Sequence, residues 1–568
     1  MNFKKTTLIL VSLMFCSANV FANTRQADNI GEAVRTQTQW EQEKALAKKA
    51  KEKIKPKPTE ILPFGVKEGG PEILVNKIDV RGDKKISYEK ILDVILKYEG
   101  KKMTLADLYR IANEITKLYE KEGFVTSYAY LPEQEVSTGN IKINVVEGKV
   151  GKVKVRGNKY FKDELLTRDL DHRLAGKVLD YDVLEKILRE LNFNSDRTVK
   201  AYLMPGETEK ETDILLVVED KKPGHVSLDV NNTGTDATGN ERFGLGYTNS
   251  NLLGIDDEWM IKNVYGTGYE GVYTSYTVPV YDNRTKIGVN YQYAHINVGG
   301  DFKDLDVKGT ANNVQIFVQR ELFQDKNMDI DGKIGFSKKR LKNERLDVAT
   351  GVDDLSVLNL DAFADVRDSW GRTFIDQGLD IGIADFLGSS DKGDSGLNRI
   401  DSGSEFTKFR GSVDRYSKLD FLPSTILHLK GRYQYSNNNL PSAEQFSLGG
   451  FNNVRGYGEG EYSGDIGGIV SAEVFMPVPF IPDFKMPFKD ETFKQSVQLV
   501  GFYDYGYAKL NKPYMGEAQH MNFAGVGAGL RIHFFKDTYG RFEWGFPVGD
   551  DSLGNNPEFH FMIQTELM

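Results

Sequence analysis

The sequence of 568 residues has one cysteine, seven scattered histidines and a formal net charge of −9. A lone cysteine excludes an internal disulfide framework. The histidines show no paired metal-site spacing, and the chain has no Walker-type phosphate loop. Its mild acidity argues against binding nucleic acid. We therefore expect no metal, cofactor, nucleotide or nucleic-acid partner.

Long apolar runs are also missing beyond the N-terminus, which excludes membrane-spanning helices there. Residues 1–22 combine Lys4 and Lys5 with a short apolar run and small residues ending at Ala22. This pattern predicts a secretory signal peptide cleaved after Ala22. Lipidation at Cys16 is disfavoured because bulky Phe15 precedes it. An exported chain of this kind would enter a membrane only as strands.

Two further segments precede the folded part of the chain. Residues 23–50 are rich in Ala, Glu, Lys and Gln with sparse apolar points, which fits either a polar helix or a solvated arm. Residues 51–72 carry prolines at 56, 58, 63 and 71 and glycines at 65, 69 and 70, which predicts a linker.

An internal repeat follows. "KIDVRGDKKIS", from Lys77, matches "KVKVRGNKYFK", from Lys152, and each copy continues with two helical patterns and two strand-like runs. Thr104 and Asp107 form a possible capping box in the first copy, and Asp180 is a candidate helix cap in the second. The sequence therefore predicts two small β-α-α-β-β domains, at residues 73–150 and 151–223.

From residue 224 to 568 the helical period gives way to alternation. In "ILHLKGRYQYS" one face holds Leu427, Leu429, Tyr433 and Tyr435, and the other holds charged and polar residues. Soluble sandwiches alternate too, but export, strands of about ten residues and fully charged inner faces favour a membrane barrel. The fold class is thus mainly β, a transmembrane antiparallel barrel of about 16 strands, wide enough for a channel.

Residues 447–465 contain a Gly-rich stretch around one cation, Arg455. Gly449, Gly450 and Gly456 allow such a loop to fold back inside the barrel. A guanidinium buried there needs a carboxylate. In "VGFYDYGYAKL" the tyrosines suit the lipid face, which turns Asp504 inward, so we expect Arg455 and Asp504 to pair.

These motifs carry a family resemblance. Val454, Arg455, Gly456 and Tyr457, followed by Phe502, Asp504 and Gly506, resemble the paired signature of the outer-membrane assembly and secretion superfamily, in which loop six is pinned to the barrel wall. The two repeats resemble POTRA domains. Two repeats after a polar helix and a linker resemble the two-partner secretion transporters (TpsB) of the haemolysin-activation and filamentous-haemagglutinin type.

The resemblance covers essentially the whole mature chain and implies its function. Such a protein lies in the outer membrane of a Gram-negative-type bacterium, with the POTRA domains in the periplasm. It is not an enzyme: it recognises an unfolded, TpsA-like haemolysin or adhesin and exports it without ATP. Its other partners are outer-membrane lipid and, during biogenesis, the barrel-assembly machinery. Residues 23–50 would then be a plug helix in the pore.

The POTRA units fit a receptor role because an extended chain can add to an exposed strand edge. The candidate edge lies in "TVKAYLMP", although an ordinary core strand would show the same pattern. Its proposed partner-binding residues are Thr198, Val199, Lys200, Ala201, Tyr202 and Leu203.

Other classes remain as alternatives. An insertase of the same superfamily would share the arginine and aspartate signature, but we expect it to carry more POTRA repeats and no plug helix. A passive porin leaves the repeats unexplained, and a soluble adhesin leaves inward charges such as Lys430 and Arg432 unexplained. The chain also ends in Met568, where barrels of this class commonly end in an aromatic residue.

Overall fold

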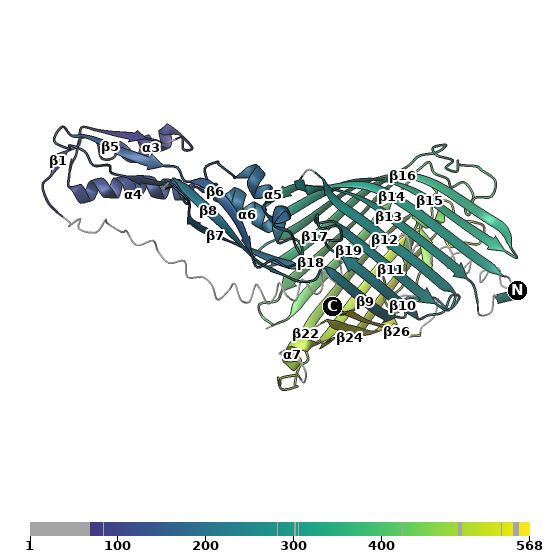
Figure 1. The fold of residues 1–568 in the computed structure, drawn as a ribbon. Coiled ribbons are helices and arrows are strands. Elements are labelled where there is room, and N and C mark those ends of the chain that lie inside the picture. Colours follow the sequence, from purple (N-terminus) through teal and green to yellow (C-terminus); the bar gives the residue numbers. More distant parts are fainter. Residues whose placement is uncertain are drawn as a thin grey trace. The chain divides into compact units, whose positions relative to one another are not determined.

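The computed structural model describes residues 69–567 except 83, 209, 281, 300–302, 305, 326, 423, 487–490, 536 and 549–555. The predicted signal peptide, plug helix and most of the linker, as well as Met568, lie outside the described residues. The chain divides into two compact units. One is formed mainly by the two repeats, and the other is a closed barrel (Figure 1).

The first repeat folds around the core that its helical pattern predicts. Its elements are β1 (Ile73–Leu74), β2 (Lys77–Arg81), α3 (Tyr88–Ile95), β3 (Lys102–Met103), α4 (Leu105–Lys121), β4 (Tyr128–Tyr130) and β5 (Asn140–Val146). The sheet order is β2-β5-β4, and β1 pairs with β3. Ile111 and Ile115 of α4 pack on Ile141 of β5, all fully buried. Thr104 and Asp107 form the expected capping box.

The second repeat has the same plan. It contains β6 (Lys149–Arg156), α5 (Asp163–Arg173), α6 (Tyr181–Leu191), β7 (Arg197–Pro205) and β8 (Glu211–Asp220). The sheet order is β6-β8-β7, so β7 is an edge strand. Asp180 caps α6 by accepting hydrogen bonds from the backbone of Asp182 and Val183. Leu184 and Ile187 of α6 are buried in the domain core.

Sixteen antiparallel strands close the barrel, as the alternation predicts. The last strand, β26, pairs with the first, β9, so the sheet has no free edge. In chain order they are β9 (Gly224–Asn231), β10 (Arg242–Asn249), β11 (Glu258–Gly266), β12 (Tyr269–Val280), β13 (Asp282–Asn297), β14 (Val307–Gln324), β15 (Met328–Arg345), β16 (Val348–Arg367), β17 (Gly371–Gly382), β18 (Thr407–Lys418), β19 (Ile426–Tyr435), β22 (Ile466–Pro477), β23 (Val497–Lys509), β24 (His520–Phe535), β25 (Thr538–Pro547) and β26 (Glu558–Leu567).

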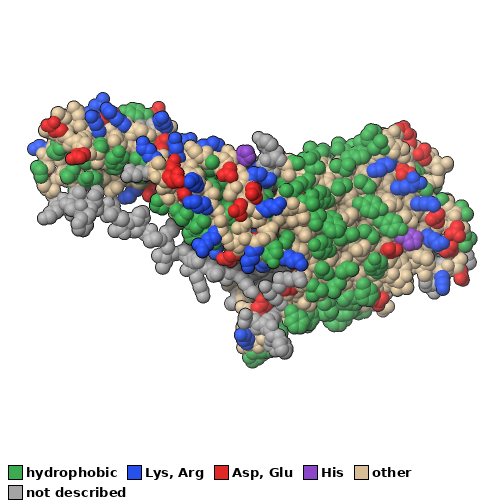
Figure 2. All heavy atoms as spheres, viewed as in Figure 1, with side chains coloured by type: hydrophobic (Ala, Val, Ile, Leu, Met, Phe, Trp, Pro, Cys, Tyr) green, Lys and Arg blue, Asp and Glu red, His purple; other side chains and the backbone are tan. Residues whose placement is uncertain are grey.

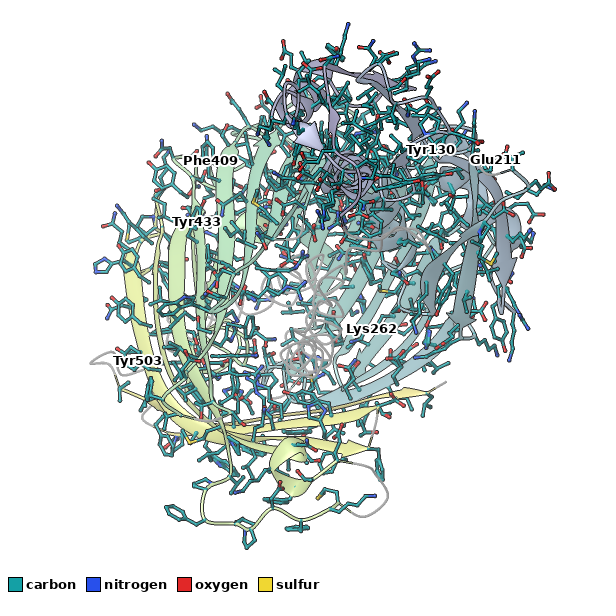
Figure 3. All side chains as sticks on the ribbon, turned by 90° about the vertical axis from the view of Figure 1, so that its left-hand side faces the viewer. Tyr130, Glu211, Lys262, Phe409, Tyr433 and Tyr503 are labelled. Atoms are coloured by element: carbon teal, nitrogen blue, oxygen red, sulfur yellow. The ribbon has the colours of Figure 1, made fainter. Side chains whose placement is uncertain are left out.

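The two faces of the barrel differ as the sequence pattern requires. Figure 2 shows hydrophobic side chains gathered in a broad band over the barrel strands. In Figure 3, Phe409, Tyr433 and Tyr503 point away from the barrel, whereas Lys262 points into it. Lys262 Nζ pairs there with Asp229 Oδ1 at 2.7 Å. Apolar side chains therefore cover the outside, and charged pairs lie on the inner wall.

The strand count fixes the two ends of the barrel. We call the end at which β9 begins the entry end and the opposite end the far end. Because consecutive barrel strands are antiparallel, the long connection between β19 and β22, which are the eleventh and twelfth strands, lies at the far end. Among the described residues, no helix combines the length and apolar character that a bilayer crossing needs.

Candidate functional site: an ionic clasp between loop six and the barrel wall

The connection between β19 and β22, here called loop six, spans residues 436–465. It contains a 3₁₀ turn, η2 (Ser442–Glu444), and a short hairpin of β20 (Phe446–Leu448) and β21 (Tyr462–Gly464). Between these two strands the chain turns back around Arg455. Arg455 is 2 % exposed although its loop leaves the sheet, which means that this part of the loop lies against the wall rather than in solvent.

Asp504 of β23 holds the arginine in a forked pair. Arg455 Nε donates to Asp504 Oδ2 at 2.7 Å and Nη2 donates to Oδ1 at 2.7 Å. The backbone N–H of Arg455 also donates to Oδ2, at 3.1 Å. Ser471 Oγ, opposite Asp504 in the β22–β23 register, donates to Oδ1 at 2.6 Å. Two planar groups joined by two hydrogen bonds fix orientation as well as distance.

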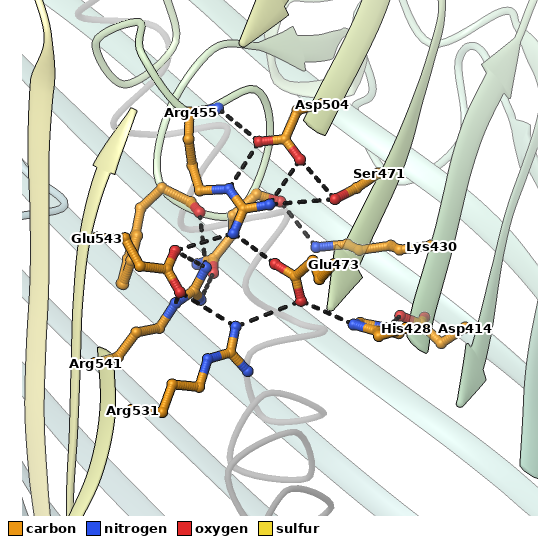
Figure 4. Close-up of polar contacts among 12 residues, drawn as sticks. Asp414, His428, Lys430, Arg455, Ser471, Glu473, Asp504, Arg531, Arg541 and Glu543 are labelled. Atoms are coloured by element: carbon orange, nitrogen blue, oxygen red, sulfur yellow. Dashed lines mark hydrogen bonds and ion pairs between the residues drawn. The ribbon is translucent and has the colours of Figure 1, made fainter. Parts of the chain in front are cut away.

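Four more charged side chains extend this pair into a network (Figure 4). Arg455 Nη1 donates to Glu473 Oε1 at 2.5 Å and to Glu543 Oε2 at 3.0 Å. Arg541 donates to both oxygens of Glu543 at 2.8 Å, and Arg531 Nη2 lies 3.3 to 3.4 Å from Glu543 and Glu473. Three arginines thus face three carboxylates. The balance limits the cost of burying so many charges in one place.

A histidine continues the network along the wall. His428 of β19 lies opposite Glu473 in the β19–β22 register, and its Nδ1 is 2.9 Å from Glu473 Oε2. Its Nε2 is 3.0 Å from Asp414 Oδ1 of β18. Lys430 Nζ donates to the carbonyl of Asn452 in loop six at 3.1 Å. The barrel strands β18, β19 and β22 to β25 therefore all contribute to this network around Arg455, which we call the clasp.

Glycines on three strands make room for the tip of the loop. A Cβ on Gly525 would lie 1.9 Å from the Arg455 carbonyl oxygen, and one on Gly545 would lie 2.4 Å from the Gly456 nitrogen. On Gly506 it would meet a side-chain carbon of Leu448 at 2.4 Å. Gly456 itself has a φ of +100°, which favours glycine. The backbone of the tip can approach the wall closely because these three wall positions carry no side chain.

Apolar contacts complete the clasp. Val454 is fully buried, and the ring of Tyr457 stacks on Phe523 with centroids 4.2 Å apart. The Arg455 Cζ atom lies 3.5 Å from the centroid of the Phe502 ring, a cation–π contact between two buried residues. All seven residues of the predicted signature, Val454 to Tyr457 with Phe502, Asp504 and Gly506, thus meet at one place.

Loop six has a second ionic anchor nearer its beginning. Glu444 of η2 is 1 % exposed, and Lys339 Nζ of β15 donates to its Oε1 at 2.5 Å. Lys408 of β18 pairs with the other carboxylate oxygen. Gln434 of β19 donates to the Glu444 carbonyl at 2.8 Å. The loop is therefore held at its beginning by β15, β18 and β19, and at its tip by β22 to β25.

The sequence analysis did not single out Glu473, Glu543, Arg531, Arg541, His428 or Glu444 as site residues. For the strand residues the signal was present. The alternation that turns Asp504 inward also turns Ser471 and Glu473 inward on β22, because every second residue shares a face. Glu444 had no such signal, since it lies in a loop and the two lysines that bind its carboxylate are more than thirty residues away in sequence.

The predicted partner-binding residues lie together on β7. Thr198, Lys200, Tyr202 and Leu203 are exposed, Ala201 is half-buried and Val199 is 3 % exposed. Val199 thus belongs to the domain core, as the ordinary core-strand interpretation required. The strand is nevertheless at the sheet edge, which a buried central strand would not be.

The outer edge of β7 is open along part of its length. Asn192 occupies it at Val199: its side chain accepts from the Val199 N–H at 2.6 Å and donates to the Val199 carbonyl at 2.9 Å. The direction of the backbone N–H and C=O groups alternates from residue to residue along an antiparallel strand. Those of Ala201 and Leu203, like those of Val199, therefore point away from β8. Within the described residues, nothing pairs with these two positions.

The carboxylates of the clasp all pair with arginine, histidine or serine, and within the described ranges no three metal-ligating side chains come together. The effect of the clasp is mechanical: it fixes a long loop to the inner wall of a closed barrel. A closed barrel with a clasped loop six, in a chain with two β-α-α-β-β domains, defines the class of outer-membrane barrel proteins with POTRA domains.

Comparisons with known proteins place the chain within this class. The family described as haemolysin secretion/activation protein ShlB/FhaC/HecB matches residues 210–532, and the ShlB-type POTRA domain matches residues 73–148. The heme/hemopexin transporter protein HuxB of Haemophilus influenzae (strain 86-028NP) is 25% identical over 466 residues, 79% of each chain. The outer membrane transporter CdiB of Dickeya dadantii (strain 3937) is 23% identical over 376 residues, 64% of this chain and 65% of CdiB.

Among solved structures, CdiB from Escherichia coli superposes with a TM-score of 0.69 and 19% identity, covering 94% of this chain and 99% of that one. Since the family match spans more than half of the sequence, the chain belongs to the haemolysin secretion/activation family, the TpsB transporters of two-partner secretion. It is an outer-membrane transporter rather than an enzyme, and the family resemblance seen in the sequence is confirmed.

Proposed function

We propose that this protein binds one unfolded TpsA-like exoprotein in the periplasm through its POTRA domains and exports it through the barrel without ATP. The observation that carries the proposal is the open edge of β7 at Ala201 and Leu203, in a transporter of this family. An extended segment of the exoprotein would add to this edge as a further strand, because main-chain hydrogen bonds can form there without displacing any partner within the described residues.

The clasp fits the export step. A loop fixed inside the barrel narrows the path, and the charged network gives it one defined position. The periplasm supplies no nucleotide hydrolysis, so folding of the cargo outside the cell would provide the drive. HuxB is a heme/hemopexin transporter protein and a relative from Serratia marcescens is a hemolysin transporter protein, so exoproteins of the haemolysin and heme/hemopexin types are the cargo classes to try first.

The test is reconstitution of the protein alone in liposomes with the unfolded N-terminal domain of a candidate exoprotein. A suitable candidate is a very large exported β-repeat protein encoded beside the transporter. Protease-protected cargo on the far side would support the proposal. Failure of every candidate, together with faster insertion of other barrels into the same liposomes, would instead support the insertase alternative.

A further inference from the structure

The connection between β22 and β23 differs from an ordinary short turn. It spans residues 478–496, of which 478–486 and 491–496 are described, and we call these described residues the rim hairpin. β22 is the twelfth barrel strand, so this connection lies at the entry end, where β9 begins. In an outer-membrane protein with periplasmic POTRA domains, the entry end is the periplasmic end, next to the inner leaflet of the outer membrane.

The rim hairpin is an ordered element. Phe493 N–H donates to the Phe484 carbonyl at 2.8 Å, and Lys485 and Thr492 form a β-bridge. Thr492 N–H donates to Gln495 Oε1 at 2.9 Å where the short helix α7 (Phe493–Ser496) begins. The rings of Phe484 and Phe493 stack with centroids 5.0 Å apart. The side chains of this segment are therefore presented on a built scaffold.

This scaffold exposes apolar side chains. Phe480 is 101 % exposed, Phe484 50 % and Ile481 38 %. Ordered segments seldom hold large apolar groups in water, because removing their surface from water is worth about 25 cal/mol per Å². Figure 3 shows the helical turn of this segment outside the ring of barrel strands, and Figure 1 likewise places α7 beyond the wall.

The exposed groups continue a row that other connections form at the same end. Large apolar residues are also exposed where consecutive entry-end turns join β14 to β15, β16 to β17, β18 to β19 and β24 to β25. They are Leu322 at 60 %, Trp370 at 73 %, Phe421 at 77 % and Phe535 at 57 %. Aromatic residues in this position mark the membrane–water interface of outer-membrane barrels. The rim hairpin extends this row of exposed apolar residues outward from the barrel wall.

We propose that the rim hairpin is an interfacial anchor that inserts Phe480, Ile481 and Phe484 among the phospholipids of the inner leaflet. The occupant is lipid rather than a protein groove because the hairpin continues the lipid-facing row of the barrel. Lys485 and Lys494 directly follow Phe484 and Phe493 in the sequence, and cations commonly flank apolar residues at a phosphate surface. The hairpin joins β22 and β23, which carry Glu473 and Asp504, so the anchor holds at the membrane surface two of the strands that bind Arg455.

The experiment places one fluorescent label on the full-length protein. Phe480→Cys is labelled with an environment-sensitive fluorophore in a Cys16→Ser background, and the protein is reconstituted in phosphatidylethanolamine–phosphatidylglycerol vesicles. The matched control is Met515→Cys, since Met515 is 105 % exposed in the connection between β23 and β24 at the far end. Heat-modifiable migration on gels checks that each barrel is folded.

The expected result is quenching at position 480 by lipids that carry a nitroxide near the headgroup, about threefold stronger than at position 515. Aqueous iodide should show the reverse order. Strong iodide quenching at 480 without lipid quenching would place the hairpin in water and overturn the proposal. Protection from both quenchers would indicate a protein contact, such as a second copy, and would also overturn it. Ile481→Cys repeats the measurement if the first variant does not fold.

Discussion

Two factors fix the position of Arg455. The first is steric: the glycines of loop six and of β23, β24 and β25 let the backbone of the loop approach the wall. The second factor is electrostatic: Arg455 is 2 % exposed, so its guanidinium must be paired, and Asp504, Glu473 and Glu543 supply the partners. Replacing such a network by apolar groups can be tolerated, but removing one partner leaves the others buried and unpaired.

Arg455→Ala is therefore expected to abolish or strongly reduce secretion while the barrel still inserts, since the strand ladder does not depend on the loop. Loss of one partner from a buried pair costs about 3–5 kcal/mol, which is enough to release the tip. The measurement is the amount of exoprotein in the medium, with heat-modifiable migration to show folding. Arg340→Ala is the matched control, because the Arg340 side chain is 60% exposed. Normal secretion by Arg455→Ala would contradict the clasp as part of the export mechanism.

Gly525→Ala tests the close contact between the loop tip and the wall glycines separately from the ionic network around Arg455. The new methyl group would lie 1.9 Å from the Arg455 carbonyl, so the tip must shift, at an expected cost of about 1–3 kcal/mol. Gly501→Ala on β23 is the control, since its Cβ would meet nothing within 4 Å. We expect faster hydrogen exchange in residues 449–460 for Gly525→Ala and no change for Gly501→Ala. Equal exchange in both variants would show that the tip does not rest on Gly525.

At the scale of elements, β7 and α4 illustrate which structural features a local sequence pattern can predict. Both capping residues of α4 and the cap of α6 were predicted from sequence, because a cap is a local signal. The strand β7 was also predicted, but its place at the edge of the sheet was not a local property. That place depends on the pairing of β6 with β8, two strands that lie about sixty residues apart in the sequence.

Ala201→Pro tests strand addition at β7. Proline removes the Ala201 N–H, which points away from β8, so the sheet keeps its own hydrogen bonds while the docking edge loses a donor. We expect at least tenfold weaker binding of the exoprotein's N-terminal domain, roughly the loss of one main-chain hydrogen bond and of the close approach it permits. Ala201→Val keeps the N–H and serves as the control. Unchanged affinity of Ala201→Pro would exclude this edge as the docking site.

The cap of α4 gives a pH dependence with a defined sign. Hydrogen bonds from the Thr104 side chain and backbone, followed by the effect of nearby Arg110, hold the pKa of Asp107 below its ordinary value of 3.8. A carboxyl whose pKa is lower in the folded than in the unfolded state stabilises the folded state at pH values above the unfolded-state pKa. That stabilisation is lost as the pH falls through the folded-state pKa. Amide protection in the first turn of α4 should therefore decline below about pH 4.

Asp107→Asn provides the comparison for this prediction. The variant should show weaker protection at neutral pH and no further decline in acid, as followed by hydrogen exchange with mass spectrometry on the full chain. A parallel decline in both proteins would assign the acid effect to other carboxyls.

At the scale of the whole molecule, the barrel and the two β-α-α-β-β domains contribute different features. The barrel has charged pairs on its inner wall, and its loop six is fixed at both Glu444 and Arg455. The second β-α-α-β-β domain has the open strand edge at β7. The predicted plug, residues 23–50, lies outside the described residues and stays a prediction from the sequence and the family resemblance.

Deleting residues 28–50 is expected to raise ion conductance, because a pore with a plug removed offers a wider path. The measurement is single-channel current in planar bilayers, compared with entry of antibiotics into cells. The deletion should leave migration of the folded barrel unchanged. If conductance also stays unchanged, this segment is a solvated arm rather than a plug.

The sequence by itself determined the fold class, the number of barrel strands and the faces of those strands, because these follow from a period of two and from turn residues that act locally. It also predicted that Asp504 points inward with Arg455, since an arginine in a glycine-rich loop and an aspartate between tyrosines each require a partner. The tertiary structure decided which further charges join them. Glu473, Glu543 and Arg531 meet through the register of four neighbouring strands, and Glu444 meets Lys339 across more than a hundred residues of chain. Such contacts depend on how the sheet closes, which no local pattern specifies.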